Sequence, residues 1–85
     1  MSYNLVYTRR AEKDLRKLDT AIKRLIGKSI IKLQDNPLEH SEKLTDPKAG
    51  TYRFRTGDYR IIFDIEGKDV VILRVGHRKE IYKRL

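Results

Sequence analysis

The sequence contains no cysteine and no tryptophan, and only two prolines and two histidines among its 85 residues. Without cysteine, neither a disulfide framework nor a thiolate metal site can form, which fits a reducing compartment. His40 and His77 lie far apart and without clustered carboxylates, a spacing that predicts no metal site. The chain also lacks a glycine-rich phosphate loop, a nucleophile elbow and a dinucleotide-binding fingerprint. We therefore expect chemistry that uses no metal, ATP or nicotinamide cofactor.

Long hydrophobic runs are missing as well. The opening residues, MSYNLVYTRRAEKD, carry neither the apolar segment nor the cleavage site of a secretory signal. No window approaches the roughly 18 apolar residues that a membrane-spanning helix needs. We expect a cytoplasmic protein without a membrane partner, folded as a single domain over residues 1–85.

Acidic residues are scarce relative to basic ones. Lysine and arginine number 20 against 12 aspartates and glutamates, which gives a formal net charge of +8. Such an excess favours a polyanion, most simply nucleic acid, or an acidic protein as the partner. The composition alone does not distinguish these two kinds of partner.

Two amphipathic helices are predicted after a short strand at residues 3–7. Thr8 is a candidate N-cap of the first helix, and Asp19-Thr20 offers a cap for the second. Asn36-Pro37 ends the second helix, and residues 38–50 read as a loop. The apolar positions recur at helical spacing; they are Ala11, Leu15 and Leu18, then Ile22, Leu25, Ile26, Ile30 and Leu33.

Three strands are predicted to follow, over residues 51–56, 59–65 and 69–75, with turns at Gly57-Asp58 and around Gly67. The order is β-α-α-β-β-β with a short C-terminal tail. This is an α+β fold in which a helical hairpin packs on one face of a small, largely antiparallel sheet.

Strand alternation separates the arginines from the aromatic residues. Tyr52, Phe54, Tyr59, Ile61 and Phe63 share the predicted helix-facing side, whereas Arg53, Arg55, Arg60 and Ile62 share the other. A two-residue loop at Gly57-Asp58 would place Arg55 opposite Arg60 and Arg53 opposite Ile62. Like charges at facing positions destabilise a sheet, so this pair indicates a use, namely binding phosphate. The alternative is a solvated face on which arginine stems lie over apolar neighbours.

The segment after the last predicted strand adds further candidates. His77 is followed directly by Arg78, and a histidine with a pKa near ~6.5 can transfer protons at neutral pH. Tyr82 brings a phenol close to the C-terminus. The alternatives are a surface histidine in a turn and a tyrosine that only packs. His40, in a charged loop, is interpreted as a surface residue.

The segments YRFRTGDYRIIF and ILRVGHRKEIYK, placed after strand-helix-helix, resemble the RelE/ParE superfamily of type II toxins and its RelE-like mRNA interferases. The resemblance covers essentially the whole chain. It implies an endoribonuclease that enters the ribosomal A site and cuts mRNA without metal, by attack of the 2′-hydroxyl on the adjacent phosphate. It also implies a cognate acidic antitoxin and a toxin-antitoxin hetero-oligomer. The catalytic positions it implies are Arg53, Arg55, Arg60, His77, Arg78 and Tyr82.

One departure from the family pattern keeps other functions open. Well-known RelE toxins have lysines where this chain has Arg53 and Arg55, and a guanidinium cannot act as a general base. The base is then His77, a group of the ribosome, or missing. If it is missing, the alternatives are a ParE-like toxin that inhibits DNA gyrase by binding, or a basic RNA- or ribosome-binding module.

The outer side of the predicted sheet also carries apolar residues. Ile62, Val71 and Leu73 share its parity, and we expect them to form an exposed apolar strip among the cations. An acidic, partly disordered antitoxin that folds on binding would match such a surface in charge and hydrophobicity.

Overall fold

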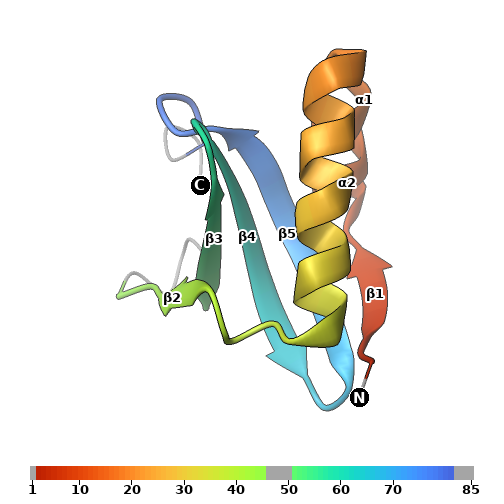
Figure 1. Ribbon diagram of the computed structural model, residues 1–85, viewed down its shortest axis with the longest axis vertical. Helices are drawn as coiled ribbons and strands as arrows, with labels where there is room; N and C mark the ends of the chain where they lie inside the picture. Colours follow the sequence, from red (N-terminus) through yellow and green to blue (C-terminus); the bar gives the residue numbers. More distant parts are fainter. Residues whose placement is uncertain (1, 46–50, 82–85) are drawn as a thin grey trace.

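Two helices lie on one face of a five-stranded sheet in the computed structural model, which describes residues 2–45 and 51–81 (Figure 1). The elements in chain order are β1 (Asn4–Tyr7), α1 (Arg9–Arg16), α2 (Thr20–Asp35), β2 (Ser41–Lys43), β3 (Tyr52–Thr56), β4 (Tyr59–Glu66) and β5 (Asp69–His77). None of the helices in the described ranges is long and apolar enough to cross a membrane. The predicted α+β architecture is confirmed, with one additional strand, β2.

Both helices begin at the predicted caps. The Thr8 hydroxyl accepts a hydrogen bond from the Ala11 N–H at 3.1 Å, and the Asp19 carboxylate accepts one from the Ile22 N–H at 3.0 Å. Each cap satisfies a backbone donor that the first helical turn cannot pair internally. Helix α2 ends at Asp35, with Asn36 as its C-cap directly before Pro37, as the sequence predicts.

The strands are ordered β1-β5-β4-β3-β2, with β1 parallel to β5 and the other neighbours antiparallel. Strand β2 lies within the segment that was predicted to be a loop, so that prediction was wrong for Ser41–Lys43. Three residues are too few to show alternation, and the open edge of β3 supplies their partners. The pairing places Glu42 opposite Arg53.

The β3–β4 hairpin has the predicted register. Gly57 adopts a φ of 61° in the turn, where a side chain would be strained. Arg55 consequently pairs with Arg60, and Arg53 pairs with Ile62.

A β-bulge in β5 reverses which alternate side chains face the helices. Ile62 pairs with Arg74 and Phe63 pairs with Ile72, so Leu73 is an extra residue in β5. Ile72 and Val75 therefore both join the buried core, although simple alternation would put them on opposite faces. The Thr8 hydroxyl donates to the Leu73 carbonyl at 3.0 Å, which ties the bulge to the start of α1.

The expected exposed apolar strip on the outer side is present only in part. Ile62 is completely buried, and Val71 and Leu73 are half-buried. Ile62 lies in register between Arg53 and Arg74, whose long side chains can cover apolar neighbours. Ile81 is also buried and packs over Gly76, where a Cβ built on the glycine would lie 3.6 Å from the Ile81 Cβ. Ile62 therefore adds nothing to the exposed surface of the outer face.

Candidate phosphate-binding site

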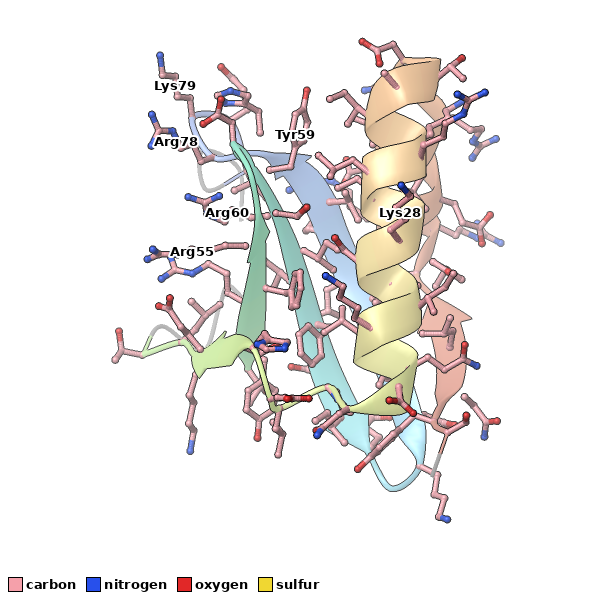
Figure 2. All side chains as sticks on the ribbon, in the orientation of Figure 1. Lys28, Arg55, Tyr59, Arg60, Arg78 and Lys79 are labelled. Atoms are coloured by element: carbon pink, nitrogen blue, oxygen red, sulfur yellow. The ribbon has the colours of Figure 1, made fainter. Side chains whose placement is uncertain are left out.

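Three arginines from two paired strands share the sheet face opposite the helices. Arg53 and Arg55 come from β3 and Arg60 comes from β4. Figure 2 shows Arg55 and Arg60 pointing away from the helices, whereas Tyr59 points toward them. The sheet therefore carries the predicted cluster of guanidinium groups. We call the surface formed by Arg53, Arg55 and Arg60 the arginine face.

A carboxylate that sequence reasoning missed lies within this cluster. Glu42 Oε2 accepts a hydrogen bond from Arg53 Nη2 at 2.7 Å, and its Oε1 lies 3.2 Å from Arg55 Nε. The hydrogen bond from Arg53, opposed by partial desolvation and aided by the positive charges of Arg55, Arg53 and Arg60, holds the pKa of the Glu42 carboxyl below its ordinary value. Glu42 is thus an anion bound by the strand arginines. No local pattern marks it, because its position depends on the pairing of β2 with β3.

Arg60 is fixed by its own hairpin. Its Nη1 donates to the carbonyl oxygens of Gly57 and Tyr59, both at 2.9 Å. These bonds hold the guanidinium over the turn and preset its direction. A preset donor loses less conformational entropy when it binds an anion.

Arg78 lies on the same side as Arg55 and Arg60, with Lys79 beside it (Figure 2). Its backbone N–H donates to the Asp58 carbonyl at 2.7 Å, and its Nε lies 3.7 Å from the Asp58 carboxylate. The turn after β5 is therefore attached to the β3–β4 hairpin, and it brings a fourth arginine to this end of the arginine face.

His77 lies beside Tyr59, away from the strand arginines. Its ring packs edge-on against the Tyr59 ring, with centroids 5.4 Å apart. Its Nδ1 accepts the Lys79 N–H at 3.1 Å, so a neutral ring in this arrangement carries its proton on Nε2. The structure brings together Arg53, Arg55 and Arg60 and adds Arg78, but it does not bring the imidazole to them. Tyr82 lies outside the described residues.

A part-buried ion pair, also missed from the sequence, fixes the end of β5 to α1. Asp14 Oδ2 accepts from Arg74 Nε at 2.8 Å and from the Val75 N–H at 3.0 Å. Strand β1 ends at Tyr7, opposite Ile72, so this part of the β5 edge has no neighbouring strand and α1 supplies the acceptor. The contact positions the segment that leads to His77 and Arg78.

Known proteins share both sequence and fold with this chain. Residues 5–82 match the family model described as ParE toxin of the type II toxin-antitoxin system, parDE. The chain is 38% identical over 87 aligned residues to Toxin RelG of Mycobacterium tuberculosis. The alignment covers 99% of this chain and 100% of the relative. It is 28% identical to the mRNA interferase toxin RelE of Escherichia coli, with 96% and 92% covered.

Solved structures show the same fold. The toxin-antitoxin complex RelBE2 from Mycobacterium tuberculosis matches with a TM-score of 0.83 and 34% identity, over 92% of this chain and 100% of that one. An archaeal RelE-RelB complex from Pyrococcus horikoshii matches with a TM-score of 0.76 and 26% identity, over 94% and 99%. The chain therefore belongs to the RelE/ParE superfamily and is a toxin of a type II toxin-antitoxin system.

Proposed function

We propose that this toxin is a ribosome-dependent, metal-independent endoribonuclease that cleaves mRNA and so inhibits translation. The observation that carries the proposal is the arginine face of Arg53, Arg55 and Arg60, which already binds one anion, the carboxylate of Glu42. The names of relatives support it, since one is called an mRNA interferase toxin.

The reaction suits a site built from fixed guanidinium groups. In RNA the 2′-oxygen attacks the adjacent phosphorus, the bond from phosphorus to the 5′-oxygen breaks, and a 2′,3′-cyclic phosphate and a 5′-hydroxyl result. The 2′-hydroxyl loses a proton and the leaving 5′-oxygen gains one. The pentacoordinate transition state carries more negative charge than the substrate, and guanidinium forks on a rigid sheet can stabilise it while they align the reacting atoms.

The geometry accounts for proton transfer less directly than for charge stabilisation. Arginine side chains do not act as bases. The carboxylate in contact with Arg53 and Arg55 has a lowered pKa, which makes Glu42 a weak proton acceptor. His77 packs against Tyr59, so the proposal gives it no step in the described arrangement. We assign the protein's main contribution to orientation and charge stabilisation, with Arg78 at the end of the same face available to the leaving oxygen.

The family match favours a second candidate function, because the matching model is named for ParE toxins. In this alternative the chain acts on DNA gyrase by binding alone, and the arginines contact the target without cleaving it.

Induced expression followed by mapping of mRNA 5′-ends separates the two functions. The proposed activity predicts new 5′-hydroxyl ends within translated codons, and these ends should disappear when the ribosomal A site is blocked. Stalled replication with intact mRNA would instead support the gyrase alternative.

The proposed partner is a cognate acidic antitoxin. The solved relatives include complexes of RelE with RelB, and the chain's net charge of +8 complements an acidic protein. We propose that the antitoxin forms a hetero-oligomer with this toxin and covers the arginine face.

A further inference from the structure

The contact between Glu42 and the arginine face has the geometry of an occupied anion site. One carboxylate bridges two guanidinium groups at 2.7 and 3.2 Å, and Arg60 adds a third favourable charge. A carboxylate and a phosphate present the same kind of acceptor oxygens to an arginine fork. A phosphate that binds Arg53 and Arg55 must therefore compete with Glu42.

The exposure of Glu42 favours its displacement by a competing anion. The side chains of Glu42 and Arg55 are 51% and 56% exposed and that of Arg53 is 21% exposed, whereas those of Asp14 and Arg74 are 13% and 17% exposed. Exposed ion pairs contribute little net stability, because water and salt screen the charges. The Asp14–Arg74 pair is suited to stabilise the fold. The Glu42–Arg55 pair is suited to exchange its carboxylate for a competing anion.

The position of Glu42 in the sheet favours the same conclusion. Strand β2 is an edge strand that pairs with β3 through only three residues. The Glu42 side chain lies at the surface, so it can swing away from the arginines without opening the core.

We propose that Glu42 is a built-in competitor for the phosphate site: it occupies Arg53 and Arg55 in the free toxin and is displaced when an RNA phosphate binds. This inference rests on the proposed function for the identity of the ligand, an RNA phosphate. The carboxylate keeps the arginines ordered between binding events, and it lowers the affinity for incidental anions. A phosphate therefore binds only if its affinity for Arg53 and Arg55 exceeds that of the Glu42 carboxylate.

The experiment compares Glu42→Gln with Glu66→Gln. Glu66 is exposed at the β4–β5 turn, so the control makes the same change in net charge away from the arginine face. Two probes are used: a short RNA with 2′-O-methyl groups throughout, which cannot be cleaved, and inorganic phosphate. Binding is followed by fluorescence anisotropy for the RNA and by the NMR signals of the Arg53 and Arg55 Nε–H groups for phosphate. Circular dichroism confirms that both variants are folded.

The expected result is that Glu42→Gln binds both probes roughly three- to tenfold more tightly than Glu66→Gln at low salt, with a smaller ratio at high salt. In the wild type, the probes should also move the pKa of the Glu42 carboxyl back toward its ordinary value. Equal affinities for the two variants would overturn the inference. Weaker binding by Glu42→Gln would overturn it too, because Glu42 would then organise the site, as would failure of every variant to bind either probe.

A separate assay of ribosome-dependent cleavage by the wild type keeps the two proposals apart. If tighter binding by Glu42→Gln occurs without any mRNA cleavage, the competitor inference stands and the proposed nuclease function fails. If cleavage occurs and the two variants bind alike, the function stands and the inference fails.

Discussion

Arg55 and Arg60 face each other on neighbouring antiparallel strands, and both point away from the helices (Figure 2). Such a like-charge pair destabilises a sheet unless an anion lies between or near the two groups. The protein supplies one partial counter-charge through Glu42 and preserves the pair with hydrogen bonds from Arg60 to its own turn. This arrangement supports the proposed binding of a phosphate at Arg55 and Arg60.

The first prediction tests Arg60. We expect Arg60→Ala to lower ribosome-dependent cleavage by roughly 10²- to 10³-fold, because it removes a preset donor to the transition state. Arg60→Lys should recover only part of the rate, since it retains the charge and loses the fork. Arg24→Ala, an exposed position on α2, is the matched control and should cleave normally. Wild-type toxicity of folded Arg60→Ala would exclude this residue from the mechanism.

The second prediction concerns His77. Because its ring packs on Tyr59 and its Nδ1 accepts the Lys79 N–H, we expect His77→Gln to leave the pH profile of single-turnover cleavage unchanged in shape. The measurement is the cleavage rate between about pH 5.5 and 8, across the ordinary histidine pKa. If the variant lost most of the rate together with its dependence on pH, His77 would be the general base after all.

The third prediction concerns the part-buried ion pair of Asp14 and Arg74. Asp14→Asn should destabilise the fold by about 2 kcal/mol, since it leaves the part-buried Arg74 charge without its counter-charge. Equilibrium unfolding in urea measures the loss, and Asp35→Asn at the exposed end of α2 serves as the control. A loss below about 0.5 kcal/mol would show that solvent already compensates Arg74.

The fourth prediction concerns Tyr7, which is partly exposed and lines a surface hollow with Leu15, Ile26 and Ile30, beside Arg16 and Lys23. Burial raises the pKa of the Tyr7 phenol above 10.0. A raised pKa in the folded state means that the associated stability is fully present below pH 10 and is lost as the pH rises through the folded value. Tyr7→Phe should therefore lose less stability than the wild type above pH 10. Melting temperatures between pH 9 and 11.5 provide the test, and parallel curves for the two proteins would contradict it.

The fifth prediction concerns the antitoxin. Co-expression with a small acidic protein encoded beside this gene should restore growth. Reversal of that protein's acidic charges should slow association more than it speeds dissociation, because long-range attraction governs the encounter. Association rates at several salt concentrations measure the effect. Recovery of ribosomes or RNA but never an acidic protein in purifications from the native host would favour an RNA-binding module.

The sequence by itself determined the features that depend on neighbouring residues. Thr8 and Asp19 cap helices because their side chains reach amides three residues ahead. The pairing of Arg55 with Arg60 follows from a two-residue turn at Gly57-Asp58, because the length of the turn fixes the register of the two strands. Once the hairpin is fixed, alternation places the strand arginines on one face. Their catalytic roles remain predictions.

Tertiary structure decided what depends on partners distant in sequence. Strand β2 exists because β3 offers an open edge, and only that pairing brings Glu42 to Arg53. The bulge at Leu73 turns Val75 into the core, and Asp14 reaches Arg74 because β1 stops short of it. Local patterns carry no signal for such contacts, since each arises from an edge or a gap left by another element. Tertiary structure likewise decides the contact of the Glu42 carboxylate with the arginine face.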